Sequence, residues 1–175
     1  MTEITPEFSR PVAVDQRHDQ GLDVTIEANE AERAALASRF GILAIDALTA
    51  TLHLKPLGRG MVRLEGHLKA QVHQACVVTL VDVVQAIDDR FERVYAPSGA
   101  ATDDERDEVE VDYEGEEPPE PLVDGIIDLG EATAEELALA LDPYPRAPGA
   151  VFEAPGDEGE AKANPFAALA KLKKE

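Results

Sequence analysis

The sequence predicts an α+β fold with a strongly curved antiparallel sheet, or a partly open barrel, built from long strands. Residues 61–74 alternate between apolar and polar side chains almost without a break, and residues 81–95 repeat the pattern after a chain reversal around 74–80. Side chains of a strand point to opposite faces with period two, so each stretch is typical of a half-buried strand. Fourteen strand residues extend about 46 Å, and sheets of such long strands usually coil.

Two shorter strands and a helix are predicted ahead of these long strands. Residues 8–14 contain a proline and suit an edge strand, where a missing N–H does no harm, and residues 20–28 alternate like a half-buried strand. Residues 30–40 are rich in good helix formers. Asn29, followed by a glutamate three positions later, is a candidate N-cap, and Gly41 stands where a helix ends.

A third long strand over 42–55 completes an antiparallel meander. Its apolar residues change parity near Asp46, which predicts a bend where the two faces of the strand exchange roles. The glycines of 57–60 are typical of a hairpin turn. Gly66 lacks a side chain and predicts a bulge within 61–74.

The second half of the chain opens with an acidic stretch. Residues 101–121 hold eleven acidic residues and a single arginine. A segment so charged buries too little apolar surface to offset its ordering entropy. We therefore expect a mobile insertion at about 97–121 within a single domain of residues 1–146. The alternation over 109–113 leaves a short strand there as an alternative.

Two further helices are predicted beyond this insertion. The first covers 134–141, with Thr133 as its N-cap, and packs its leucines on the sheet. Residues 147–163 have the composition of a linker, and residues 164–175 form a helical motif that begins at Asn164. So short a helix is marginal alone in water, so its apolar stripe must bind its own domain or a partner. The stripe consists of Phe166, Leu169 and Leu172.

Length and composition suit one soluble domain. The 175 residues are 44% apolar and lack tryptophan, so the core should consist of aliphatic side chains. No apolar run approaches the roughly 18–20 residues of a membrane span, and the first residues lack the basic and apolar regions of a signal peptide. The single cysteine excludes an internal disulfide. Together these observations favour a cytoplasmic protein that makes no use of a membrane.

The formal net charge of −20 is unevenly distributed. Residues 1–95 carry a net charge of −4, and residues 96–175 carry −16. Such a charge opposes broad binding to a phosphate backbone, which requires clustered lysine and arginine. It suits a basic protein partner, because opposite potentials accelerate encounter. The alternative is that the acidic loops only keep the protein soluble.

The sequence contains no recognisable catalytic or metal-binding constellation. Phosphate-loop, dinucleotide and nucleophile-elbow motifs are absent. His67 and His73 share one strand face but are about 20 Å apart, too far to bind one metal ion. Cys76 stands alone among small apolar residues, which predicts a buried structural thiol. We therefore predict no enzyme, no catalytic residue, no metal site and no cofactor.

Six stretches form a set that is spread over most of the chain. They are Phe8–Val12, Gln74–Leu80, Ile87–Phe91 with the acidic loop that follows, Ile127–Glu131, Leu141–Arg146 and Asn164–Lys173. This set resembles the YceD-like family of large ribosomal RNA subunit accumulation proteins, and most of all its α-proteobacterial branch. Many relatives carry CxxC at the chain reversal, and this chain departs from that pattern with Cys76 and Thr79.

The resemblance implies a role in the synthesis, processing or assembly of large-subunit ribosomal RNA, without known catalysis. In the family the gene often neighbours one for a small basic ribosomal protein. Together with the charge, this leads to the hypothesis that the acidic loop and the terminal helix bind a basic ribosomal or assembly protein. Association with ribosomal RNA would then be weak or indirect. The predicted partner-binding residues are Asp103, Asp104, Glu105, Asp107, Glu108, Phe166, Leu169 and Leu172.

Two other functions remain open from the sequence. The protein could bind ribosomal RNA directly through the polar side of the strand over 61–74. The residues that would do so are Arg63, His67, Lys69 and His73. It could also be a structural adaptor unrelated to ribosomes.

Overall fold

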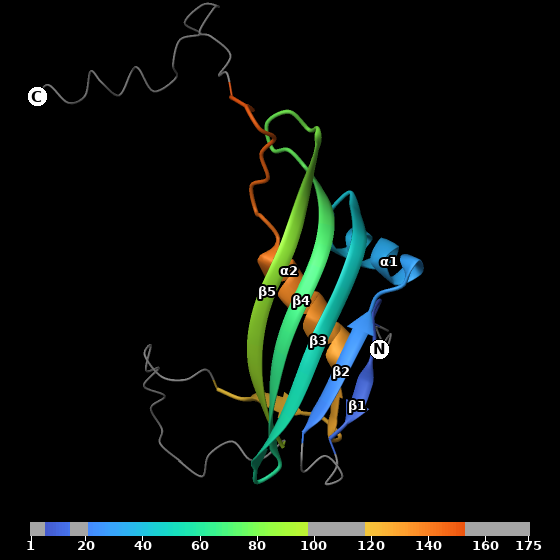
Figure 1. The fold of residues 1–175 in the computed structure, drawn as a ribbon, viewed down its shortest axis with the longest axis vertical. Helices are drawn as coiled ribbons and strands as arrows, with labels where there is room; N and C mark the ends of the chain where they lie inside the picture. The colour runs from blue at the N-terminus through green and yellow to red at the C-terminus, as the bar shows by residue number, and fades with distance from the viewer. Residues whose placement is uncertain (1–5, 15–20, 98–117, 153–175) are drawn as a thin grey trace, which may run out of the picture.

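The computed structural model describes residues 6–14, 21–97 and 118–152 and shows an α+β fold (Figure 1). In chain order the elements are β1 (Pro11–Ala13), β2 (Leu22–Glu27), α1 (Glu30–Phe40), β3 (Ala44–Gly58), β4 (Met61–Ala75), β5 (Asp82–Pro97), β6 (Glu120–Leu122), β7 (Ile126–Asp128) and α2 (Leu129–Ala140). The main sheet has the strand order β2–β3–β4–β5–β6. A separate two-stranded sheet pairs β1 with β7.

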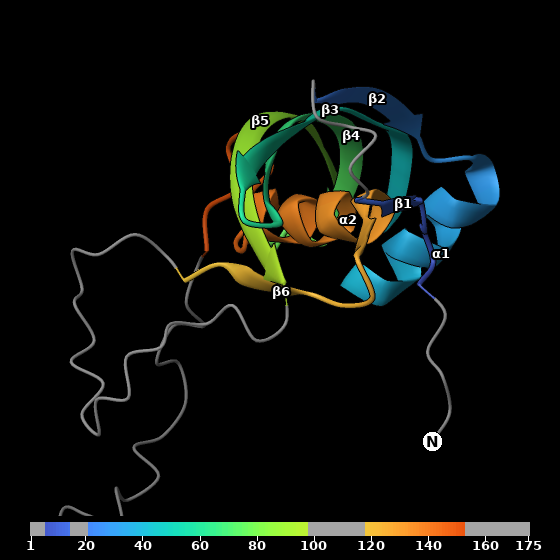
Figure 2. The same ribbon diagram turned by 90° about the horizontal axis from the view of Figure 1, so that it is seen from below.

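The main sheet is open, with β2 and β6 as its edge strands. The prediction of a strongly curved sheet or partly open barrel is wrong, and so is that of purely antiparallel pairing, because β6 runs parallel to β5. The three-residue β6 pairs only with the last residues of β5 and cannot extend the sheet toward β2. Viewed from below, α2 lies against one face of the sheet (Figure 2). In a closed barrel, further strands would be needed on that side.

The three long strands confirm the alternation seen in the sequence. In β4, the even-numbered side chains such as Val62, Leu64, Leu68 and Val72 are buried, and the odd-numbered ones are half-buried or exposed. The predicted bend near Asp46 is also confirmed. The pairing of β3 with β4 shifts register between Ile45 and Ala47, so Ile45 and Leu48 are both buried although they differ in parity.

Gly66 serves close packing and not a bulge. Pairing of β4 with β5 continues without a shift through Gly66, which lies opposite Phe91. A Cβ atom on Gly66 would overlap the Phe91 ring. The expected bulge is therefore wrong. The aromatic ring of the neighbouring strand occupies the space that a side chain at Gly66 would need.

Helix α1 has the predicted bounds and the predicted caps. Asn29 Oδ1 accepts a hydrogen bond from Glu32 N at 3.0 Å, and Glu32 Oε2 accepts one from Asn29 N at 2.8 Å. These reciprocal bonds form a capping box. Gly41 ends the helix with φ of 66°, a left-handed conformation that glycine adopts without strain.

Helix α2 begins five residues before the predicted start. Its N-cap is Asp128, whose Oδ1 accepts hydrogen bonds from the N–H groups of Gly130 and Glu131. The predicted N-cap, Thr133, is instead buried within the helix, and its hydroxyl donates to the Leu129 carbonyl at 2.8 Å. Gly130 fits the first turn because a Cβ atom there would overlap the Phe8 carbonyl group.

Other predicted segments lie outside the described residues. These are most of the acidic insertion with its alternative strand at 109–113, the linker beyond residue 152 and the helical motif 164–175. The end of the predicted insertion is described, and there Glu120–Leu122 form β6. Neither α1 nor α2, the two helices of the described ranges, is long and apolar enough to span a membrane.

Candidate functional site

The residues predicted as an alternative RNA-binding set lie together on one side of β4. Arg63, His67, Lys69 and His73 occupy odd-numbered positions, and the even-numbered side chains between them are buried. We call this solvent-facing side of β3, β4 and β5 the outer face. The sequence placed these four residues on one face correctly, but it did not show which groups surround them.

Three of the predicted cations on the outer face lie beside carboxylates from the same sheet, whereas the exposed Arg90 on β5, opposite His67, forms no ion pair with the residues that the structure describes. Arg63 Nε lies 3.0 Å from Glu92 Oε1 on β5, without hydrogen-bond geometry. Asp88 serves two partners, with Oδ1 2.6 Å from His67 Nε2 and Oδ2 3.4 Å from Lys69 Nζ. A nucleic acid would have to displace these carboxylates before its phosphates could use the cations, so the outer face offers little net positive charge.

His73 bridges two carboxylates at the upper end of the outer face. Its Nδ1 lies 2.7 Å from Asp82 Oδ2, and its Nε2 lies 2.9 Å from Asp46 Oδ2. The register shift at Asp46 helps to turn this carboxylate outward. The hydrogen bonds to Asp82 and Asp46 raise the pKa of His73 above its ordinary value, because they favour the imidazolium. His73 therefore links the ends of β3 and β5 through β4.

The turn Cys76–Val81, which we call the corner, joins β4 to β5. Cys76 N donates to the Val81 carbonyl at 2.8 Å, and Leu80 N donates to the Cys76 carbonyl at 2.9 Å. Cys76 is fully buried, as predicted. Its Sγ accepts hydrogen bonds from Ala147 N at 3.3 Å and Thr79 N at 3.4 Å. These N–H groups, Ala147 first, lower the pKa of the Cys76 thiol to about 6.

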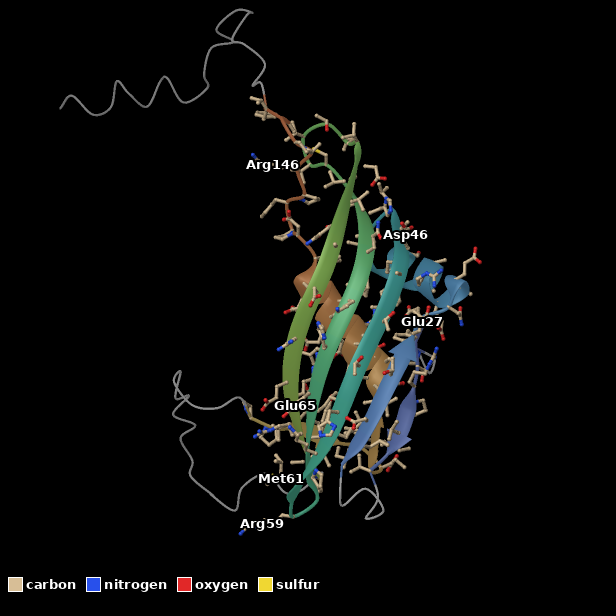
Figure 3. All side chains as sticks on the ribbon, in the orientation of Figure 1. Glu27, Asp46, Arg59, Met61, Glu65 and Arg146 are labelled. Carbon is tan, nitrogen blue, oxygen red and sulfur yellow. The ribbon has the colours of Figure 1, made fainter. Side chains whose placement is uncertain are left out.

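The segment after α2 is fastened to the corner by hydrogen bonds. Val77 N donates to the Pro145 carbonyl at 2.9 Å, and Gln74 Nε2 donates to the Asp142 carbonyl at 2.9 Å. Arg146, which lies in this segment, is seen beside the corner in Figure 3. Two stretches about seventy residues apart thus form one structural unit. Each stretch is recognisable in the sequence by itself, but neither pattern indicates that the two stretches meet.

A groove of about 370 Å³ lies between the C-terminal ends of α1 and α2 and the corner. We call it the corner groove. Asp142 is the only charged residue among the described residues that line it. Most of the others are apolar and include Phe40, Ile42, Val77, Ala138, Leu141 and Pro145. The groove is shallow and open to solvent, and polar atoms make up a large share of its lining surface.

Gln74 also lines the corner groove and carries an unused acceptor. The residue is only 7% exposed, and its Nε2 is held by the Asp142 carbonyl, which can only accept. The orientation of the amide is thereby fixed. Its Oε1 is buried and has no hydrogen-bond donor among the residues that the structure describes. An unpaired buried acceptor costs about 1–3 kcal/mol. Because Oε1 has almost no accessible surface, a ligand cannot reach it unless the side chain moves.

Several large apolar side chains are exposed on the corner and on the segment after α2. Leu80 is 78% exposed and Val77 48% on the corner, and Tyr144 is 72% and Phe152 71% exposed on the following segment. Scattered exposed apolar residues are ordinary. Here they lie on the two segments that meet at the corner groove, which marks this end of the molecule as a candidate interaction surface.

The ion pairs on the other side of the molecule hold elements together. Arg93 is 12% exposed, and its guanidinium lies 2.6 Å from Glu135, 2.7 Å from Glu136 and 3.3 Å from Glu120. These pairs tie β5 to β6 and to α2. Arg93 is thereby fully engaged in the fold and offers no free charge to a ligand.

The described ranges contain no group of three or more His, Cys, Asp or Glu side chains that could hold a metal ion. The predicted partner-binding residues all lie outside these ranges. They are Asp103, Asp104, Glu105, Asp107, Glu108, Phe166, Leu169 and Leu172.

Comparison with known proteins gave one match. The sequence profile of the family described as "Large ribosomal RNA subunit accumulation protein YceD" matches residues 64–173, which is more than half of the chain. The match begins in β4 and runs through the corner and the segment fastened to it. No curated protein and no solved structure matches the chain.

Proposed function

The chain belongs to the YceD family of large ribosomal RNA subunit accumulation proteins, and from this premise we propose that it supports ribosome assembly by binding a basic protein. Family membership implies a role in large-subunit ribosomal RNA accumulation and an association with ribosome assembly. We propose that the acidic segment around 103–108 and the terminal motif 164–175 make the contact. The protein would act without catalysis, and ribosomal RNA would associate weakly or indirectly. We retain the α-proteobacterial branch as a prediction.

The observation that carries this proposal is the contrast in charge between the outer face and the second half of the chain. On the outer face, Arg63, His67 and Lys69 lie beside carboxylates. Residues 96–175 carry a net charge of −16. A negative surface attracts basic proteins and repels phosphates, so it could shield a ribosomal protein until that protein meets its RNA.

Capture of partners from a nuclease-treated lysate tests the proposal. The wild-type protein should retain a basic ribosomal or assembly protein after the RNA has been digested. The purified pair then allows affinity to be measured across a salt series. Neutralising Asp103, Asp104, Glu105, Asp107 and Glu108 to the amides should lower the affinity at least about tenfold and flatten its salt dependence.

A control variant separates local contact from net charge. Neutralising five acids outside the proposed site, Asp124, Glu153, Asp157, Glu158 and Glu160, changes the net charge equally. We expect a clearly smaller loss of affinity from this control. Equal losses of affinity in the two variants would mean that only the net charge matters and not the position of the acids. Unchanged affinity in the first variant would refute the role of the acidic segment.

A further inference from the structure

We propose that the corner groove is the docking site for residues 164–175 of the same chain. The proposal rests on the proposed function in one respect, since the apolar stripe that fills the groove is the one assigned to partner binding. Docking would keep Phe166, Leu169 and Leu172 out of water until a partner displaces them. The groove is thus a resting place for the terminal motif, and the partner competes with it.

The chemistry of the groove calls for an occupant with apolar side chains. Val77 contributes an apolar wall that is 48% exposed, and its burial would be favourable. Phe40, Ile42 and Pro145 add further apolar side chains. The apolar stripe of the terminal motif supplies matching groups.

The electrostatics of the groove favour a basic occupant. Helices α1 and α2 both end at this site, and the C-terminal end of a helix carries partial negative charge. The last turn of α2 contains no basic residue to compensate for it. Asp142 adds a full negative charge. The terminal motif supplies Lys171, Lys173 and Lys174 directly beside its apolar stripe.

The covalent connection is long enough for this docking. Pro145 lines the groove, and Phe152 is seven residues further along the chain, so the two are no more than about 25 Å apart. Residues 153–163 can span up to about 36 Å when extended, which is sufficient for a return to the groove. A tether of this length gives an effective concentration of about 1 mM, so a weak intrinsic affinity is enough.

Hydrogen exchange of backbone amides in the full-length, partner-free protein tests the proposal. A nine-residue helix gives little protection by itself. Docking with an intrinsic Kd ten times below an effective concentration of about 1 mM would slow exchange at 166–172 about tenfold. Exchange at the rate of a free peptide would overturn the proposal.

Two substitutions on α2 locate the binding site. Ala138 is exposed and lines the groove, so Ala138→Arg should block the groove, repel the lysines and abolish the protection at 166–172. Leu139 is 78% exposed and does not line the groove, so Leu139→Arg should leave the protection unchanged. Thermal unfolding checks that both variants fold. Protection that survives Ala138→Arg in a folded protein would place the motif elsewhere and refute the groove as its site.

The outcomes also separate this proposal from the proposed function. Protection at 166–172 without any captured basic protein would uphold the docking and reject the partner. Capture of a basic protein, without slowed exchange at 166–172, would uphold the partner and reject the docking. If both hold, Ala138→Arg should raise the affinity for the partner severalfold, because the competing internal contact is gone.

Discussion

The outer face of the sheet and the corner groove expose different kinds of groups. On the outer face, Arg63, His67 and Lys69 each lie within 3.4 Å of a carboxylate from the neighbouring strand. The corner groove is lined mostly by apolar residues, with Asp142 as the only charge among the described ones. A cation that already lies beside a carboxylate gains little from a ligand, whereas exposed apolar side chains gain by leaving water.

The two regions also differ in what holds them together. The outer face belongs to a long ladder of strand pairs, in which β4 is paired with β3 from Met61 to His73 and with β5 from Val62 to Ala75. The corner and the segment after α2 are joined by a few hydrogen bonds between distant parts of the chain. Substitutions should therefore affect overall stability most in the sheet, and local properties most at the corner.

The largest effect is expected inside the sheet. Gly66→Ala should destabilise the protein by about 1–3 kcal/mol, the range for overpacking a filled site, because the new Cβ atom overlaps the Phe91 ring. Urea unfolding measures the change. Phe91→Leu combined with Gly66→Ala should be more stable than the sum of the two single changes predicts. Simple additivity would show that the ring and the glycine are not coupled.

At the corner, the expected effect is on acid–base behaviour. The N–H groups around Sγ hold the pKa of Cys76 at about 6. Because the folded pKa lies below the unfolded one, the stabilisation is fully present above the unfolded pKa and is lost as the pH falls through about 6. Thiolate absorbance of the native protein should titrate with a midpoint near 6. A midpoint near the ordinary thiol value of about 8.5 would contradict the contacts at the corner.

The smallest of these effects concerns His73 on the outer face. Its pKa is raised by Asp82 and Asp46, so its stabilising contribution is complete below the ordinary value of 6.5. The contribution disappears as the pH rises through the folded pKa. The urea midpoint of wild type should exceed that of His73→Gln most at pH 5.5, and the gap should narrow by pH 8.5. A difference in urea midpoint that grows with pH would show that the pKa of His73 is lowered in the folded protein and not raised.

Local signals predicted much of this fold from the sequence. The capping box at Asn29 and the strict alternation of β4 depend on neighbouring residues, and the structure confirms both. The start of α2 was missed because Thr133 and Asp128 are both good N-caps, and Gly130 reads as a helix breaker. Only contact with the distant Phe8 shows why a glycine is needed there.

Features that depend on distant contacts could not be predicted. Closure of the sheet depends on whether the last strand reaches β2, and the three residues of β6 do not. The role of Gly66 depends on which residue of β5 lies opposite. The corner groove forms where the ends of α1 and α2 meet the corner and the segment after α2. No periodicity or spacing in the sequence indicates that these parts lie together.

We propose that this protein recognises a basic protein and not RNA. The most direct measurement is the affinity for fragments of large-subunit ribosomal RNA at salt concentrations between about 50 and 200 mM. Over this range, binding that depends on contacts to phosphates weakens steeply as salt is added. We expect no binding stronger than nonspecific attraction, and no change on Arg63→Ala with Lys69→Ala. Tight binding that falls steeply with salt and is lost in this double variant would contradict the claim and make the outer face an RNA-binding surface.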